Sequence, residues 1–337
     1  MTMNEEKIID AFNDLDEFII TCHQNADGDA IGSSNALGLF LQKYGKNCKV
    51  IYPEEVPSKY TFLPKPNNAI TFDEYAYENE IRTEGLIVLD SSDSGRVEAI
   101  LKKIKYESLI NIDHHPTNSF FGDLNLVEPE KSATCQVLFD LFDYFKENPG
   151  IEIDHDIAMN LYAGIMTDTG SFKFENTNSN TFEAASKLVS YGVLPHHVSG
   201  QIYESMPVKT FNLVRELINT LTLSEDKKIA WISCSKSLLD KYEVGPEELE
   251  GVINYPKSLE PVEFAVFFKE TEEGYTKIGM RSKTMDVSKI ALEFEGGGHK
   301  RAAGCFLKES LDKSRERIIT RLKKEIHSEG KLIERDN

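Results

Sequence analysis

The chain has 337 residues, a formal net charge of −18 and five cysteines. This negative charge excludes a protein that wraps long nucleic acid, because phosphate binding depends mainly on Lys and Arg. The length allows two domains with a large core, and no apolar run is long enough to cross a bilayer, so no membrane partner is expected. The scattered cysteines, with no Cys-x-x-Cys pair, and an acidic rather than signal-like start predict a reduced cytoplasmic protein.

Strand-like and helix-like segments alternate along the first half of the chain. Strands are predicted at Phe18–Cys22, Cys48–Tyr52, Gly85–Asp90 and Leu109–Ile112. Apolar residues at helical spacing predict helices at Ala30–Tyr44, Val97–Lys103, Ala133–Lys146, His155–Met166 and Thr181–Tyr191. This alternation predicts an α/β domain, residues 1–192, with a doubly wound, mostly parallel sheet and helices on both of its faces.

The pattern changes in the second half. An irregular run, Val193–Pro207, and a helix at Lys209–Leu223 predict a linker and connecting helix over residues 193–225. Residues 226–330 are then expected to form a smaller α+β domain. Its predicted strands are Ile229–Cys234, Val262–Lys269 and Tyr275–Met280, and its predicted helices are Pro246–Ile253, Val287–Phe294 and Glu309–His327.

The segment from His23 to Asp29 places one imidazole and two carboxylates directly after the first predicted strand. Gly28 allows a sharp turn there, and Asp29 lies near the start of the next helix, where helix amides favour a carboxylate. Taken alone, Asp29 is more often a helix cap and His23 a core histidine. Three ligand-type residues, His23, Asp27 and Asp29, in one loop instead favour a metal site.

Further residues of the same kind follow later segments. Asp90 ends a strand-like run, His114 and His115 follow another, and Asp168 ends a helix-like segment, where the helix dipole disfavours a carboxylate without a cation. A set of four carboxylates and two imidazoles carries too much negative charge to be buried without cations. It also supplies enough ligands for two metals that share a carboxylate. Oxygen and imidazole ligands suit Mn²⁺, so the sequence predicts a metal-dependent hydrolase. His115 either supports a neighbouring metal ligand, donates to substrate phosphate, or is a surface histidine.

A locally basic segment lies near the C-terminus. From Lys277 to Lys308 there are seven Lys or Arg residues against three Asp or Glu. The glycines of Gly296–Gly304 are expected to enter a helix and to form a backbone cradle for a small anion, with His299, Lys300 and Arg301 at its mouth. Arg281 suits bidentate phosphate contact. The plainer alternatives are a solvated charged face and a flexible turn.

These motifs resemble those of the DHH phosphoesterase superfamily. The similar residues are His23, Asp27, Asp29, Asp90, Asp113-His114-His115 and Asp168, while Gly296–Gly304 resembles the glycine-rich substrate loop of the DHH-associated C-terminal domain. The resemblance covers essentially the whole chain, with the motifs in the family's order. Thr167–Thr177 is most similar to the stand-alone branch, which acts on very short RNA and on 3′-phosphoadenosine 5′-phosphate (pAp). The chain departs from the family at Ala26, where Pro is usual, which predicts a slightly looser loop.

The resemblance implies two Mn²⁺ ions, with Mg²⁺ or Co²⁺ as substitutes. One ion would be held by His23, Asp27 and Asp90, and the other by Asp29, Asp90, His114 and Asp168, so that Asp90 bridges them. It further implies that His115 contacts the scissile phosphate, with Asp90 and His115 as the catalytic residues. Across the cleft between the domains, the implied substrate-binding residues are Arg281, Ser282, Gly297, Gly298, His299, Lys300 and Arg301.

The resulting hypothesis is a Mn²⁺-dependent phosphohydrolase that degrades RNA of about two to five nucleotides and converts pAp to AMP. The alternative within the superfamily is a phosphodiesterase for pApA or cyclic di-AMP, which would share every ligand named. A pyrophosphatase would generally lack the glycine-rich loop, and a long-strand exonuclease would need a more basic surface. A non-catalytic nucleotide-binding protein would tolerate missing ligands, yet all six are present. Proteins of this class and size often dimerise, so a homodimer is also expected.

Overall fold

The computed structural model describes residues 2–75, 81–145, 152–245, 249, 251–271 and 273–333, with side chains described as far as residue 326. The chain divides into two compact units, Met1–Ser205 and Met206–Asn337. Each unit is built on its own six-stranded sheet.

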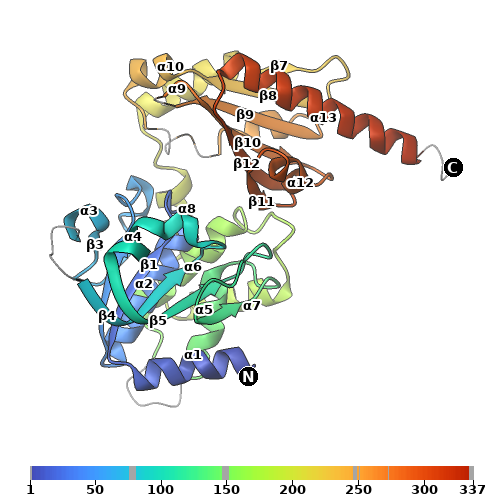
Figure 1. The fold of residues 1–337 in the computed structure, drawn as a ribbon. Helices are drawn as coiled ribbons and strands as arrows, with labels where there is room; N and C mark the ends of the chain where they lie inside the picture. Colours follow the sequence, from blue (N-terminus) through green and yellow to red (C-terminus); the bar gives the residue numbers. More distant parts are fainter. Residues whose placement is uncertain are drawn as a thin grey trace. The chain divides into compact units, whose positions relative to one another are not determined.

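The sheet of the first unit is parallel throughout (Figure 1). In spatial order its strands are β3 (Ile70–Thr71), β2 (Asn47–Tyr52), β1 (Glu17–Cys22), β4 (Ile81–Leu89), β5 (Ile104–Asp113) and β6 (Leu124–Val127). The strand order reverses between β1 and β4, which are neighbours in the sheet although β2 and β3 lie between them in sequence. In open α/β sheets, sites form outside the carboxyl ends of the strands at such a point.

Helices cover both faces of this sheet because successive strand residues point to opposite sides. Ile20 and Ile87 pack in one core with the helices α1 (Met3–Asp14), α2 (Gly28–Lys43), α5 (Thr134–Asp143), α6 (His155–Asp168), α7 (Ser179–Ser190) and α8 (Pro195–Tyr203) and with the short helix η1 (Ser58–Tyr60). Ile19 and Leu86 pack in the other core with α3 (Phe72–Tyr75), η2 (Ser94–Val97) and α4 (Glu98–Lys103). The predicted doubly wound α/β architecture is confirmed.

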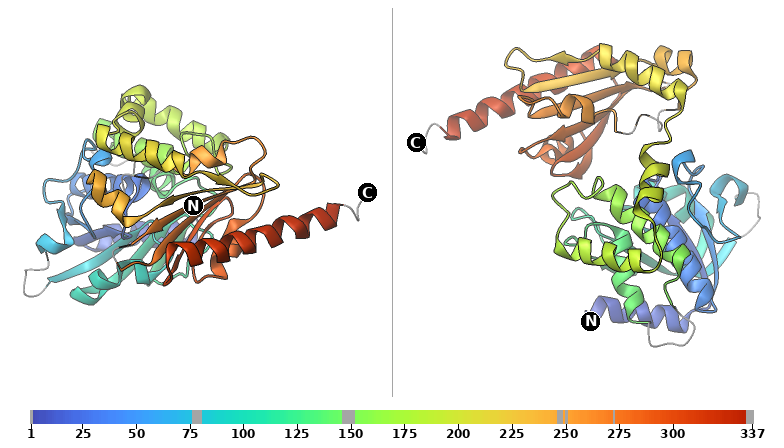
Figure 2. Two further views of the ribbon diagram at one scale, coloured as in Figure 1. Left: turned by 90° about the horizontal axis from the view of Figure 1, so that it is seen from above. Right: turned by 180° about the vertical axis from the view of Figure 1, so that it is seen from behind.

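The second unit has a mixed sheet with helices on both faces (Figure 2). Its strand order is β11 (Gly297–His299), β12 (Ala302–Leu307), β10 (Thr276–Ser282), β9 (Phe264–Glu270), β8 (Ile229–Cys234) and β7 (Thr222–Leu223), and in it β8 and β9 are the parallel pair. One core lies under α12 (Val287–Leu292) and α13 (Leu311–Ile333). The other lies under α9 (Val208–Asn219) and α10 (Lys236–Tyr242). The predicted smaller α+β unit is therefore present.

Some elements differ from the prediction. The run expected to be irregular contains α8, whose Val198 and Ile202 are buried in the core of the first unit, whereas α9 packs in the second. Helix α1, which carries the buried Ile8 and Phe12, was not predicted. The helix predicted at Pro246–Ile253 falls partly outside the described residues. Its described end is a turn that leads into α11 (Asn254–Lys257). The end of the helix predicted at Ala133–Lys146 also lies outside them.

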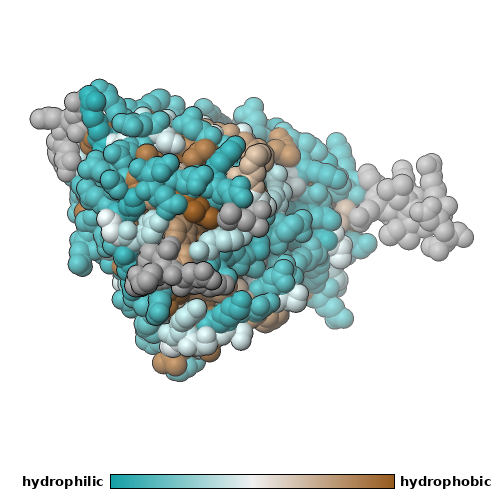
Figure 3. All heavy atoms as spheres, turned by 90° about the horizontal axis from the view of Figure 1, so that it is seen from below, coloured by the Kyte–Doolittle hydropathy of each residue, from teal (hydrophilic) through white to brown (hydrophobic). Residues whose placement is uncertain are grey.

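The described helices contain no segment with the length and apolarity that a membrane crossing requires. The face drawn in Figure 3 is largely hydrophilic, with apolar side chains gathered in small groups. Such small apolar groups are ordinary on a protein surface and need no bound partner to explain them.

Candidate metal centre

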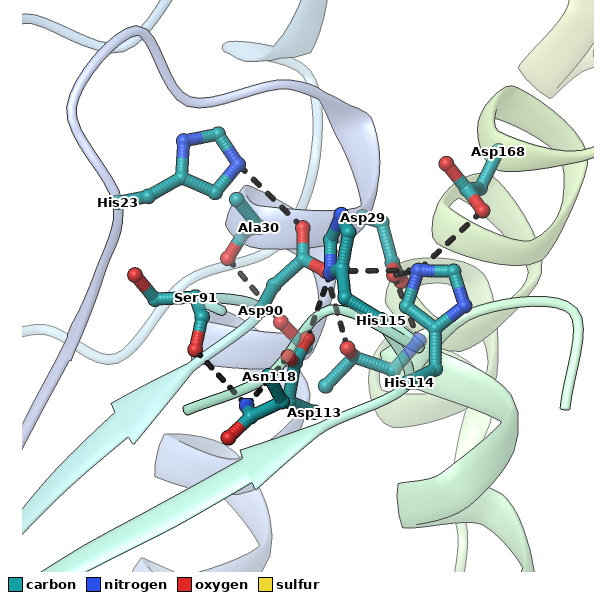
Figure 4. Close-up of polar contacts among 12 residues, drawn as sticks. His23, Asp29, Ala30, Asp90, Ser91, Asp113, His114, His115, Asn118 and Asp168 are labelled. Carbon is teal, nitrogen blue, oxygen red and sulfur yellow. Dashed lines mark hydrogen bonds and ion pairs between the residues drawn. The ribbon is translucent and has the colours of Figure 1, made fainter. Parts of the chain in front are cut away.

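Three neighbouring strands of the first sheet end side by side and place the central residues of the candidate site. Cys22, Leu89 and Ile112 are in register across β1, β4 and β5. The residues that follow these positions are His23, Asp90 and Asp113, and His114 and His115 come next in the chain. Parallel packing thus gathers imidazoles and carboxylates from segments far apart in sequence at one sheet edge (Figure 4).

Asp27 and Asp29 enter the site from the start of α2. Asp27 is the N-cap of this helix, and its carboxylate accepts hydrogen bonds from the amides of Asp29 and Ala30 at 3.0 and 3.1 Å. Asp29 is fully buried, and its carboxylate instead accepts from the amides of Thr134 and Cys135 at the start of α5. The cap of α2 is therefore Asp27, whereas Asp29 faces the site and another helix.

Asp168, the last residue of α6, completes the set of predicted ligands. His114 lies among three carboxylates, and Figure 4 shows Asp168 approaching it from α6. The His114 Nε2 atom is 3.4 Å from Asp168 Oδ2, 3.7 Å from Asp90 Oδ1 and 4.0 Å from Asp29 Oδ2. The six predicted metal ligands, from His23 to Asp168, are thus gathered at one end of the sheet.

The electrostatics of this cluster favour a bound cation. Burial raises the pKa of Asp90 well above its usual value, and the nearby charges of Asp29 and Asp27 raise it further. Desolvation and the same two carboxylates also raise the pKa of Asp168. Buried carboxylates that repel one another are stabilised when a cation lies between them.

The donor atoms also fit metal ligation. Ligand atoms of His23, Asp27 and Asp90 lie within 4.8 Å of one another, and so do those of Asp29, Asp90 and His114. Asp90 belongs to both groups. Oxygen and imidazole donors of this kind suit divalent ions such as Mn²⁺. The residues present therefore fit one or more divalent cations.

His23 is oriented by contacts that the sequence did not reveal. Its Nδ1 lies 2.8 Å from the Gln24 carbonyl oxygen, and the Arg96 Nη2 atom lies 2.7 Å from the same nitrogen. Its Nε2 is 3.4 Å from Asp90 Oδ2. Burial lowers the pKa of His23, and the Arg96 charge contributes, so the neutral imidazole that a metal needs is favoured. Arg96 can only donate, so its bond to Nδ1 and donation from Nδ1 to the Gln24 carbonyl are alternatives. In the second of these, the Nε2 lone pair is directed at the cluster.

His115 forms a carboxylate–imidazole pair with Asp113. Its Nδ1 is 2.7 Å from Asp113 Oδ1, and the Asn118 side-chain amide donates to Asp113 Oδ2 at 2.6 Å. Burial disfavours the imidazolium, but the hydrogen bond to Asp113 and the charge of Asp90 outweigh it and raise the pKa of His115 to about 10. From sequence, Asp113 is recognisable as part of the Asp113-His114-His115 motif but has no evident role, and Asn118 carries no signal.

The glycine-rich segment of the second unit is a β-hairpin. Helix entry was the wrong expectation for Gly296–Gly304, because Gly297–His299 pairs with β12 and Lys300-Arg301 forms the turn. A Cβ at Gly298, where φ is +134°, would lie 2.6 Å from the Ala302 carbonyl oxygen, so a side chain has no room there. The close approach of the two paired strands at this point accounts for the glycine. Lys300 is exposed at the tip of the hairpin.

The predicted anion-binding residues of this unit are gathered beside that hairpin. Arg281 and His299 both pair with Ala302, so their side chains share one face of the sheet. Arg301 donates to the carbonyl of Thr284. Ser282 is buried, and its hydroxyl donates to the Met285 carbonyl, so it orders the turn after β10 instead of presenting its hydroxyl to a substrate.

A row of glycines lies next to Arg281 and His299. The row consists of glycines in register across β10, β12 and β11, namely Gly279, Gly304 and Gly297. It lies two positions along each strand from a second row, which consists of Arg281, Ala302 and His299. The residues between the two rows on β10 and β12, Met280 and Ala303, are buried in the core under α12 and α13. Since alternate residues face opposite sides, the glycine row forms a flat strip without side chains on the other face.

Comparison with known proteins gives matches in both units. Residues 17–165 match the family model for the DHH family, N-terminal domain, and residues 228–328 match that for the DHHA1 domain. The chain is 33% identical over 317 residues to the bifunctional oligoribonuclease and PAP phosphatase NrnA of Thermus thermophilus, covering 93% of this chain and 91% of the relative. The Bacillus subtilis protein of the same name is 27% identical over 297 residues, covering 86% and 89%.

A solved structure has a similar fold. An exopolyphosphatase-related protein from Bacteroides fragilis superposes with a TM-score of 0.84 at 26% identity, covering 96% of this chain and 98% of that one. The match extends over both sheets, so the architecture described above recurs in a distinct sequence.

Proposed function

Because this chain belongs to the DHH family of phosphoesterases, we propose that it is a Mn²⁺-dependent phosphohydrolase that degrades very short RNA and dephosphorylates pAp. Its substrates would be RNAs of about two to five nucleotides, released as mononucleotides, and pAp, converted to AMP. The observation that carries the proposal is Asp90, whose carboxylate belongs to both groups of metal-ligand atoms. The relatives named oligoribonuclease and PAP phosphatase support the choice of substrates.

The proposed ligands divide into two sets. His23, Asp27 and Asp90 would hold one Mn²⁺, and Asp29, Asp90, His114 and Asp168 the other, with Mg²⁺ or Co²⁺ as substitutes. Bound there, divalent ions would supply Lewis acidity to an attacking water and to the phosphate oxygens. The chain contributes a shared carboxylate at the end of β4 and a buried, partly enclosed setting that strengthens charge interactions.

His115 and Asp113 supply the proton-handling part of the proposed mechanism. Asp113 holds the His115 ring through Nδ1 and favours its protonated form. The protonated imidazole would donate a hydrogen bond to the scissile phosphate and stabilise the charge that develops on its oxygens. Asp113 is fully buried and fixed by Asn118, so the ring orientation is set before substrate binds.

We assign recognition of the rest of the nucleotide to the second unit. Arg281, His299, Lys300 and Arg301 would bind phosphate or base, with Gly297 and Gly298 keeping the surface open and Ser282 ordering the turn beside Arg281. A guanidinium beside a hairpin tip that carries Lys300 suits a phosphate group. The glycine strip next to it suits a flat ring, because the three residues that form the strip carry no side chains of their own.

The net charge of the chain and the state of its cysteines guide our proposal for its substrates and its cellular compartment. The net charge of −18 disfavours long RNA, since affinity for long strands depends on many basic contacts. All five cysteines are buried free thiols, as expected for a reducing compartment. We therefore place the enzyme in the cytoplasm with short nucleotides as its substrates.

A substrate panel tests the proposal directly. With Mn²⁺ and equal substrate concentrations, we expect fast product release from pAp and a diribonucleotide and little from an RNA of about 20 nucleotides. The same panel includes pApA and cyclic di-AMP. A clear preference for either of these would assign the same site to second-messenger degradation, and no turnover of any member would reject a phosphohydrolase.

Filling the glycine strip should weaken substrate binding without disturbing the metal centre. Within 4 Å, a Cβ at Gly279 would meet Ile253 Cδ1 alone among the described residues, at 3.7 Å, so the backbone accepts a side chain there and Gly279→Leu extends it over the strip. We expect KM for the diribonucleotide to rise about tenfold, equivalent to about 1.4 kcal/mol, with kcat unchanged. Steady-state kinetics beside Gly200→Leu, where an added Cβ meets nothing within 4 Å, provide the matched comparison. An unchanged KM in Gly279→Leu would remove the strip from the substrate site.

A further inference from the structure

The segment Lys131–Cys135 leads into α5 and includes its first two residues. It contacts, directly or through Asn176, each ligand proposed for the second metal. We propose that this segment is a positioning element that sets the affinity of the second metal independently of the first. The inference rests on the proposed function and adds the residues that separate its two metal sites. The segment forms hydrogen bonds with Asp29, Asp90 and His114, and it is linked to Asp168 through the side chain of Asn176.

The first contact is with Asp29. The N-cap of α5 is Ala133, which has no side-chain oxygen to satisfy the first amides of the helix. Asp29 takes that place, since its Oδ2 accepts from the Thr134 amide at 2.6 Å and its Oδ1 from the Cys135 amide at 2.9 Å. Two bonds to adjacent amides fix the plane of the carboxylate, and the positive end of the helix partly offsets its charge.

The second contact is with Asp90. The Thr134 hydroxyl donates to Asp90 Oδ1 at 3.0 Å, and Thr134 is fully buried. One threonine therefore holds two carboxylates, Asp29 through its backbone and Asp90 through its side chain. A change to the side chain alone can test the second of these bonds while the first remains.

The remaining ligands are held through carbonyl groups of the same segment. His114 Nδ1 lies 3.3 Å from the Lys131 carbonyl oxygen, which favours a proton on Nδ1 and leaves Nε2 for a metal. The Asn176 side-chain amide donates to the Ser132 carbonyl at 2.9 Å and lies 3.4 Å from Asp168 Oδ2. Ser132 is in turn held by Gln136, whose Oε1 accepts from both its amide and its hydroxyl.

The ligands exclusive to the first metal are supported elsewhere. Asp27 is held by amides of its own helix, and His23 by Gln24 and Arg96. The two proposed sites share Asp90, but its two oxygens differ. Thr134 holds Oδ1, which lies 3.7 Å from His114 Nε2, whereas Oδ2 lies 3.4 Å from His23 Nε2, so Thr134 supports the oxygen on the side of the second site. Because outer hydrogen bonds to metal ligands typically change affinity by about 10- to 100-fold, loss of a support should affect its own site.

The test is a Mn²⁺ titration of the metal-free full-length protein, followed by calorimetry and by electron paramagnetic resonance. In Thr134→Val, we expect the first binding step to keep its affinity and the second to weaken about 10- to 100-fold. Thr134→Ser retains a hydroxyl and should restore the second step. Excess Mn²⁺ should recover kcat in Thr134→Val with KM for the diribonucleotide unchanged, a recovery that general misfolding would not permit.

Two further variants keep the inference falsifiable. Asn176→Ala removes the link to Asp168 and should weaken the second step as well, even if Thr134→Val folds poorly. Thr276→Val makes the same substitution at a buried threonine of the second unit and should leave both steps unchanged. Equal weakening of both steps, or no weakening, in Thr134→Val and Asn176→Ala would overturn the inference. A wild-type protein that neither binds Mn²⁺ nor hydrolyses any substrate would instead overturn the proposed function.

Discussion

Asp90→Asn is expected to lower kcat by about a thousandfold or more, because the substitution removes the carboxylate shared by both proposed metal sites. The asparagine oxygen is a neutral and weaker ligand, and it cannot compensate the charge of two cations. The measurement is release of AMP from pAp across a range of Mn²⁺ concentrations. Activity at the wild-type level would reject a mechanism that depends on a shared carboxylate.

Asparagine is the informative replacement because of the backbone at this position. Asp90 has a φ of +54°, a conformation that Asp and Asn tolerate better than most residues. Its amide donates to the Ile112 carbonyl at 3.1 Å, a bond that the variant retains. Loss of activity in Asp90→Asn therefore reports on the carboxylate and not on a displaced strand end. Asp90→Ala would combine that loss with backbone strain.

In the absence of metal, Asp90→Asn should make the fold more stable, although the same substitution lowers kcat. Burial and the charges of Asp29 and Asp27 raise the pKa of Asp90, so its ionised form destabilises the metal-free fold. That penalty is absent below the ordinary pKa of an aspartate, grows as pH rises from there to the raised pKa of Asp90, and is complete above it. With a chelator present, we expect Asp90→Asn to unfold at a higher temperature than the wild type at neutral pH, with a smaller difference at acid pH.

Added Mn²⁺ should stabilise the wild type more than it stabilises Asp90→Asn. For the wild type the gain is about 2.7 kcal/mol per site at a Mn²⁺ concentration a hundred times Kd. A less stable metal-free variant would contradict this reading.

The parts of the site that could be predicted from sequence are those that follow buried parallel strands. His23, Asp90 and His114 each come directly after an apolar run, and parallel packing requires such residues to meet at one sheet edge. Asp168 could be predicted because it ends a helix where a carboxylate needs a cation. Each of these features can be recognised within a few residues of sequence, and the geometry of a parallel sheet then determines where the side chains lie.

The residues that hold the ligands gave no comparable signal. Thr134 bonds to Asp29 from 105 positions away and to Asp90 from 44 positions away. Asn118 and Arg96 also act through contacts that no periodicity or spacing encodes. The glycine-rich segment was misread for a related reason. A glycine run suits a helix entrance and a tight hairpin equally well, and the pairing of Gly297–His299 with β12 decides between them.

Asp113→Asn is the second substitution with a large expected effect, because it changes the proton affinity of His115 without touching a proposed metal ligand. Asp113 accepts from His115 Nδ1 at 2.7 Å, and this bond is the first of the contacts that raise the pKa of His115. An amide carries no charge, so the His115 pKa should fall. The alkaline limb of kcat/KM, where the protonated imidazole is lost, should then move to lower pH.

The pH profile distinguishes this role from a structural one. General acid–base groups typically contribute about 10²- to 10⁴-fold, so His115→Ala should lose activity by that factor at pH values below the His115 pKa and should show no alkaline limb. Asp113→Asn should approach wild-type activity at acid pH, where its imidazole is still protonated, and fall below it as pH rises. An amide has a single acceptor oxygen. When that oxygen accepts from Asn118, the NH₂ group faces His115 Nδ1 and disfavours the imidazolium further, while the bond to Asn118 favours a folded variant. A uniform loss across the pH range in Asp113→Asn would mean that Asp113 supports the loop alone, and a profile identical to the wild type would mean that His115 does not act through its proton.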